Sequence, residues 1–129
     1  MKQIMVFGTF DGLHPGHLDF FKQAKDYGDY LTVVIARDIN VKKIKGKLPK
    51  YSETERLKQI IALKQVDRPI LGQIKDVYKV IRDEKPDIIA LGYDQEKYTN
   101  NLVKKFPKIK IIRLKPYKPE IYKSSKLNK

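Results

Sequence analysis

The sequence has no cysteine, no tryptophan and only two histidines among its 129 residues. The absence of thiols excludes disulfides, cysteine-ligated zinc and a thiol nucleophile, and it suits a reducing interior. No apolar run approaches the roughly 18 residues of a membrane span, and the first residues lead into a strand-like stretch rather than a signal peptide. We therefore expect a cytoplasmic protein with no membrane partner.

Acidic residues are also scarce, because 15 Asp and Glu stand against 28 Lys and Arg, which gives a net charge of +13. Such an excess favours polyanions: nucleic acid, acidic lipid or phosphorylated small molecules. The basic residues gather in two segments, residues 37–50 and residues 104–129, each with a single acid. Two such segments can flank one anionic ligand.

Short apolar runs and helical stripes alternate along the chain. The runs predict strands over residues 3–9, 30–36, 66–72, 86–92 and 108–114, and the stripes predict a helix after each of the first four, the second beginning near Ser52. Residues 37–50 read as a long basic loop. Continuous apolar strands in strict alternation with helices predict an α/β fold, a single-domain, Rossmann-like, doubly wound parallel sheet of about five strands over residues 1–129.

The first motif reads MVFGTFDGLHPGHLDFF, residues 5–21, and follows the first predicted strand. Its glycines at positions 8, 12 and 16 allow tight turns, and Gly16 and His17 open a helix whose amides and dipole favour an anion. The spacing fits neither the dinucleotide fingerprint nor the P-loop. A different phosphate chemistry is needed.

His14 and His17 stand three residues apart across this helix start, so both imidazoles can donate to negative charge on a phosphate. The alternative is a pair of ordinary histidines that cap or pack the loop. A zinc site is less well supported, because two ligands without a third do not complete it.

The segment GTFDGLHPGH resembles the G-T-F-D-x-x-H-x-G-H signature of the HIGH-motif nucleotidylyltransferases, in particular their cytidylyltransferase-like group. Further segments are similar to that group: IKGKLPKYSETER to its K-x-K loop and following Glu-Arg helix, ALGYDQ to its G-x-D segment, and YKSSKL to its terminal phosphate-binding motif. Lys123 departs from that terminal motif, which usually has a hydroxyl there.

This resemblance implies site residues. The catalytic residues would be His14, His17 and Lys45. The nucleotide would be bound by Thr9, Phe10, Gly16, His17, Gly92, Asp94, Ser124 and Ser125. The acceptor and its phosphate would meet Asp11, Lys45, Lys47, Arg56, Tyr117 and Tyr122.

Several of these residues have structural alternatives. Arg56 can instead pair with Glu53 or Glu55 on its own helix, and Asp11 can position the loop rather than assist a metal. Gly92 and Asp94 can form a turn. Ser124 and Ser125 can cap a terminal helix.

The reaction implied is attack by a phosphate oxygen of the acceptor on the α-phosphorus of a nucleotide, with loss of pyrophosphate and with Mg²⁺ or another divalent cation on the triphosphate. LGYDQ and KPYKPEIYKSS look most like the archaeal FAD synthase branch, which implies ATP and FMN as substrates. The alternatives are CTP with a polyol phosphate and ATP with a sugar phosphate. The resemblance also suggests a homodimer. A nucleic-acid-binding domain would use the basic charge as well, but would not need HPGH in a glycine loop.

Overall fold

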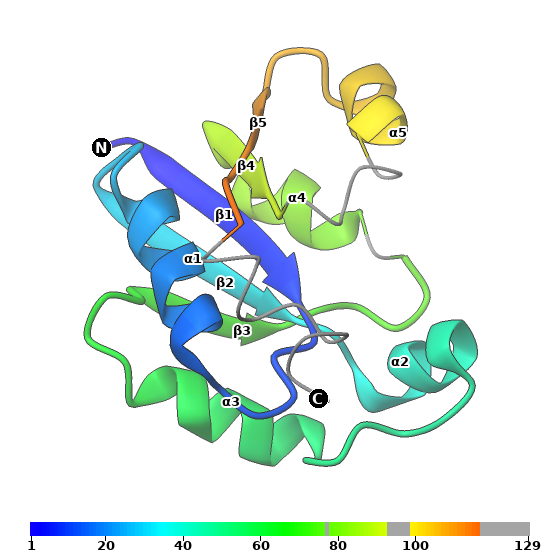
Figure 1. Cartoon of the computed structure of the whole chain (residues 1–129). Coiled ribbons are helices and arrows are strands. Elements are labelled where there is room, and N and C mark those ends of the chain that lie inside the picture. Colours follow the sequence, from blue (N-terminus) through cyan, green and yellow to red (C-terminus); the bar gives the residue numbers. More distant parts are fainter. Residues whose placement is uncertain (77, 93–98, 117–129) are drawn as a thin grey trace.

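The computed structural model describes residues 1–76, 78–92 and 99–116, which form a five-stranded sheet and five helices (Figure 1). The strands are β1 (Gln3–Gly8), β2 (Tyr30–Ile35), β3 (Arg68–Leu71), β4 (Ile88–Leu91) and β5 (Lys110–Arg113). The helices are α1 (Pro15–Lys25), α2 (Asp38–Lys45), α3 (Glu53–Ile61), α4 (Lys79–Glu84) and α5 (Thr99–Lys105).

All neighbouring strands pair in parallel, in the order β3-β2-β1-β4-β5. The predicted doubly wound α/β sheet is therefore confirmed. The strand order reverses between β1 and β4, and in such sheets ligands bind beyond the carboxyl ends of the strands at this point. The opening motif leaves β1 at this edge.

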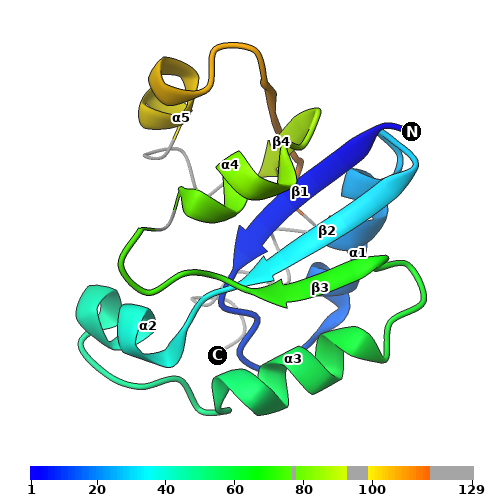
Figure 2. The ribbon, with the colours of Figure 1, turned by 180° about the vertical axis from the view of Figure 1, so that it is seen from behind.

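Helices cover both faces of the sheet, so the strands are apolar on both sides. Side chains of α1 and α3 pack against one face, seen in Figure 1, with Ile4 and Val6 of β1. Side chains of α4 and α5 pack against the other, seen in Figure 2, with Met5 of β1. This alternation within one strand explains the continuous apolar runs.

The predicted loop over residues 37–50 was partly wrong, because α2 occupies Asp38–Lys45. Only Val41 of this helix is buried, so the segment lacks the broad apolar stripe that signals a helix. The helix lies beyond the arrowheads of β1, β2 and β3 (Figure 1). It ends at Gly46, whose φ of 82° is left-handed.

The helix predicted from Ile74 starts later, at Lys79. The Asp76 carboxylate accepts the Tyr78 N–H at 3.1 Å, and this side-chain turn precedes the helix.

The second predicted helix, α3, begins where it was expected. The Ser52 hydroxyl accepts the Glu55 N–H at 3.2 Å, which is one of the two hydrogen bonds of a capping box. Within the described residues, no helix is long and apolar enough to cross a membrane.

Candidate active site

The loop after β1 turns sharply at two residues with positive φ, Phe10 at 52° and Gly12 at 90°. Phe10 is an unusual residue for this conformation, and its ring is buried. The ring lies over Gly8, where an added Cβ would be 2.6 Å from the Phe10 Cζ. Glycine at position 8 therefore lets the ring fold back across the end of β1.

His14 caps α1 with its side chain. Its Nδ1 accepts the Gly16 N–H at 3.0 Å, so Nδ1 carries no proton and the neutral ring has its proton on Nε2. A side chain at position 16 would clash with this ring, since a Cβ added to Gly16 would lie 2.7 Å from the His14 Cε1. The His17 N–H donates to the His14 carbonyl. The amides predicted to hold a phosphate are thus already used within the loop, and the exposed His14 ring keeps Nε2 as its donor.

His17 stacks on His14, with ring centroids 3.9 Å apart and planes inclined by 28°. Its ring centroid also lies 5.5 Å from that of Phe10, in a T-shaped arrangement with planes inclined by 80°. Burial, with the charge of His14 as a second cause, lowers the pKa of His17 to about 4. The ring is therefore neutral at pH 7. Its Nδ1 is buried without a hydrogen-bond partner among the described residues.

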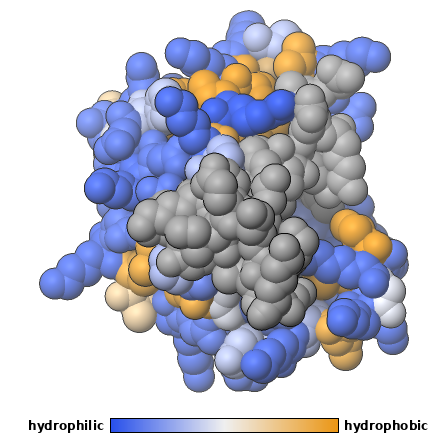
Figure 3. Space-filling model, viewed as in Figure 1, coloured by the Kyte–Doolittle hydropathy of each residue, from blue (hydrophilic) through white to orange (hydrophobic). Residues whose placement is uncertain are grey.

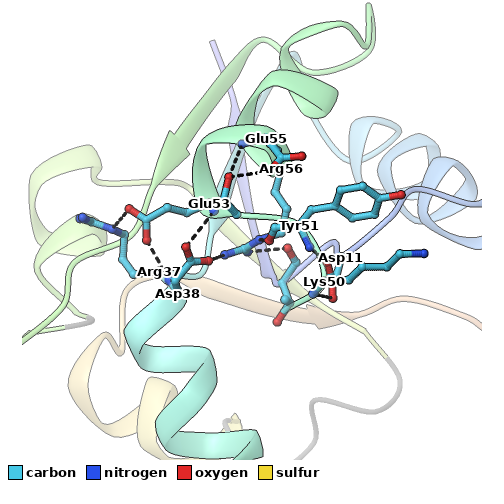
Figure 4. Close-up of polar contacts among 10 residues, drawn as sticks. Asp11, Arg37, Asp38, Lys50, Tyr51, Glu53, Glu55 and Arg56 are labelled. Atoms are coloured by element: carbon cyan, nitrogen blue, oxygen red, sulfur yellow. Dashed lines mark hydrogen bonds and ion pairs between the residues drawn. The ribbon is translucent and has the colours of Figure 1, made fainter. Parts of the chain in front are cut away.

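The N-termini of α2 and α3 cap each other (Figure 4). The Asp38 carboxylate accepts the Glu53 N–H at 3.1 Å, and the Glu53 carboxylate accepts the Asp38 N–H at 2.8 Å. Arg37 donates to the Glu53 carboxylate at 2.9 Å. A carboxylate at a helix N-terminus is stabilised by the free amides and the helix dipole. This exchange holds α2 beside α3.

Arg56 is fully buried beneath this junction. Its guanidinium donates to the Asp38 carboxylate at 2.6 Å, to the Thr9 carbonyl at 2.8 Å and to the Tyr51 carbonyl at 3.1 Å. With no exposed surface it cannot meet a ligand in this structure, and its acidic partner is neither Glu53 nor Glu55. We correct the predicted phosphate contact: Arg56 is a positioning residue that joins two loops of the site to the start of α2.

Asp11 fastens the loop that follows α2. Its two carboxylate oxygens accept the N–H groups of Lys50 and Tyr51 at 2.6 and 2.8 Å (Figure 4). Partial burial opposes ionisation, but these two hydrogen bonds and the charges of Arg56 and Lys45 hold the pKa of Asp11 below its usual value. Of the two roles considered for Asp11, the structure displays loop positioning.

A cavity of about 290 Å³ opens between the two loops joined by Asp11. Four predicted site residues line it: Thr9 and Asp11 from the opening loop, and Lys45 and Lys47 from the end of α2 and the turn after it. Neither lysine forms a salt bridge with a carboxylate in the described part of the chain, so both charges are available to an anion. The sequence analysis did not predict the other four lining residues: Val41, Leu48, Pro49 and Lys50.

Gly92 is the remaining predicted residue that the structure describes. Gly92 is buried directly after β4, the strand next to β1 at the reversal of strand order. Asp94, Ser124, Ser125, Tyr117 and Tyr122 lie outside the described residues, so their predicted roles stay predictions. Hydrophilic side chains cover most of the coloured surface in Figure 3.

Comparison with known proteins identifies the family. Residues 5–127 match the family described as cytidylyltransferase-like. The chain belongs to the cytidylyltransferase-like family.

Several relatives with known names share more than 40% of their residues with this chain. The chain is 42% identical over its whole length to the FAD synthase of Thermoplasma volcanium, covering 93% of that protein. It is 44% identical to the FAD synthase of Aciduliprofundum boonei, over 91% of this chain and 80% of that one. A solved structure, the lipopolysaccharide core biosynthesis protein from Thermoplasma volcanium, is 43% identical with a TM-score of 0.81 over 91% of this chain and 98% of that one.

A more distant structure shows the fold alone. Pantoate-beta-alanine ligase from Francisella tularensis is 23% identical, with a TM-score of 0.62 over 88% of this chain and 59% of that one. The fold of this protein therefore also occurs in proteins of low sequence identity.

Proposed function

We propose that this protein transfers the AMP group of ATP to the phosphate of FMN, forming FAD and pyrophosphate. The observation that carries this proposal is the 42% identity to an FAD synthase along the entire chain. The relation is not confined to the opening motif. It includes α2 and the loop after it, which line the cavity.

The chemistry needs no protein nucleophile. An oxygen of the FMN phosphate attacks the α-phosphorus of ATP, and the bond from that phosphorus to the oxygen bridging to the β-phosphorus breaks. Catalysis of this kind is mainly positioning and stabilisation of charge. A single well-placed hydrogen-bond donor contributes about 3 kcal/mol to such a transition state.

The stacked histidines fit this task as hydrogen-bond donors. The His14 tautomer set by the Gly16 N–H leaves a proton on Nε2, and His17 is neutral because its pKa is about 4. We assign both imidazoles to hydrogen-bond the phosphate oxygens of the nucleotide. Lys45 and Lys47, on the other side of the opening loop, supply positive charge to the phosphates.

A divalent cation would accompany the triphosphate. No group of three His, Asp or Glu within the described residues can hold a metal alone. Mg²⁺ in such enzymes is bound mainly by substrate phosphates and water with one or two carboxylates, and Asp11 is the acidic residue among those lining the cavity. When bound, the ion neutralises charge on the phosphates of the nucleotide.

A second candidate acceptor is a sugar phosphate, favoured by the solved relative described as a lipopolysaccharide core biosynthesis protein. Both candidates use the same phosphoryl chemistry and differ only in the body of the acceptor.

The test is a matrix of ATP and CTP against FMN, glycerol phosphate and sugar phosphates, with Mg²⁺, following pyrophosphate release and the nucleotidylated product. We expect turnover with ATP and FMN and the formation of FAD. Turnover with a sugar phosphate or glycerol phosphate, without FAD formation, would overturn the choice of acceptor. The His14→Asn variant is the control for contaminating activity.

A further inference from the structure

One apolar side chain is exposed among the lysines of the cavity. Leu48 is 59% exposed, lies between Lys47 and Pro49, and lines the cavity opposite the opening loop. Isolated apolar residues are common on protein surfaces. Leu48 differs because Val41 and Pro49 line the same cavity, so these three residues form the apolar wall of the cavity.

The turn at Gly46 creates this combination of charge and apolar surface. Its left-handed conformation, with φ of 82°, reverses the chain between Lys45 and Lys47 so that both sides of the turn line one cavity. Asp11 holds the far end of the turn through the Lys50 and Tyr51 N–H groups. Leu48 and Pro49 therefore belong to a loop that Asp11 holds in place, whereas Val41 comes from α2.

A ligand that matches the lining of this cavity has an apolar body and an anionic group. Ligand pockets usually measure about 300–1,000 Å³, so a cavity of about 290 Å³ accommodates part of a dinucleotide rather than all of it. Lysines without salt bridges favour a phosphate, and an apolar wall favours a ring system over a polyol. A sugar phosphate would leave Leu48 in contact with hydroxyl groups and would gain little from it.

We propose that Val41, Leu48 and Pro49 form the wall that binds the isoalloxazine ring of the acceptor, while Lys47 binds its phosphate. This inference rests on the proposed function, because it assumes that the acceptor is FMN. It makes Leu48 a specificity-determining residue. The contact depends on apolar area, so it acts on binding of the acceptor and not on the chemical step.

The experiment uses the full chain and two flavins. FMN carries the ring system and a phosphate, whereas riboflavin carries the ring system alone. Titration by flavin fluorescence gives Kd for each with wild type, Leu48→Ser, Lys47→Ala and the control Ile44→Ser. Ile44 is 67% exposed on α2, four residues from Leu48, and is not among the residues that line the cavity.

We expect Leu48→Ser to raise Kd about 10-fold for both flavins, since loss of an apolar contact in a pocket has effects of this order. Lys47→Ala should raise Kd for FMN and leave riboflavin unchanged. Ile44→Ser should leave both within about twofold. In steady-state kinetics, Leu48→Ser should raise KM for FMN with kcat and KM for ATP unchanged.

Other results overturn the inference. If Leu48→Ser binds both flavins like wild type, the ring lies elsewhere. If it weakens FMN but not riboflavin, the cavity holds only the phosphate. A wild-type protein that forms no FAD refutes the proposed function itself, whereas FAD formation with an insensitive Leu48→Ser variant refutes only the placement of the ring.

Discussion

Asp38 and Glu53 exchange backbone hydrogen bonds: each carboxylate accepts the N–H of the other residue, at 3.1 and 2.8 Å. The two residues open α2 and α3, so two helix N-termini are capped by one reciprocal pair. Asp38 also faces the buried Arg56 at 2.6 Å. This arrangement places α2, and with it Lys45, at the carboxyl edge of the sheet.

Removing either carboxylate should destabilise the fold, but to different extents. Glu53→Ala loses a cap and should cost about 1 kcal/mol. Asp38→Ala also leaves the Arg56 charge buried without its acid, and should cost about 3 kcal/mol or more. Urea unfolding measures both. Asp38→Asn keeps an acceptor for the Glu53 N–H but not the charge, so it should resemble Asp38→Ala; equal losses for Glu53→Ala and Asp38→Ala would contradict this account of Arg56.

Asp11→Ala should release the loop over residues 46–52 while the sheet stays folded, because Asp11 accepts two N–H groups of that loop. We expect faster trypsin cleavage after Lys47 and Lys50, and kcat/KM for FMN lower by about 10-fold. The control is Asp83→Asn, which removes an exposed carboxylate from an i,i+4 pair on α4. Cleavage as slow as in wild type would show that Asp11 does not hold this loop.

His14 and His17 should be essential for turnover. The His14→Asn and His17→Ala variants should each lower kcat by roughly 100-fold or more, with His17 at least as important. Asn can still cap α1, so His14→Asn separates the catalytic role from the cap. A thermal melt shows whether the fold survives. Near-normal turnover in both variants would exclude the imidazoles from transition-state stabilisation.

The lowered pKa of His17 predicts acid sensitivity. The folded value is about 4 and the unfolded value is about 6.5, so below pH 6.5 the unfolded chain binds a proton that the folded chain does not. Stability should therefore fall as pH decreases from about 6.5 to about 4, and His17 should contribute no pH dependence above 6.5. Urea unfolding of wild type and His17→Gln at pH 4.5 and 7.5 measures this difference. A loss on acidification that is the same in both would assign it to other groups.

The parallel sheet could be predicted because its signals are local and strong. Each strand is a short apolar run, and residues such as Ile4 and Met5 pack on opposite faces, which explains the lack of alternation. The opening motif could be predicted because its glycines and histidines lie within ten residues.

The parts that could not be predicted depend on contacts between distant segments. The helix α2 has one buried residue, Val41, and its cap comes from Glu53, fifteen residues later. Arg56 has acidic neighbours on its own helix, which suggested local pairing, yet its partner is Asp38. Leu48 resembles any exposed loop residue until the turn at Gly46 places it beside Lys45 and Lys47.

Phe10 contacts both the hydrophobic core and the candidate active site. Its ring packs 5.0 Å from Phe21 in the core and 5.5 Å from His17 in the site. A change of volume at Phe21 therefore reaches an imidazole through one intervening ring, in an interior packed too tightly to absorb it. A larger side chain in the core on the α1 side would therefore displace Phe10 and, with it, His17, so substitutions that add volume there should lower turnover as well as stability.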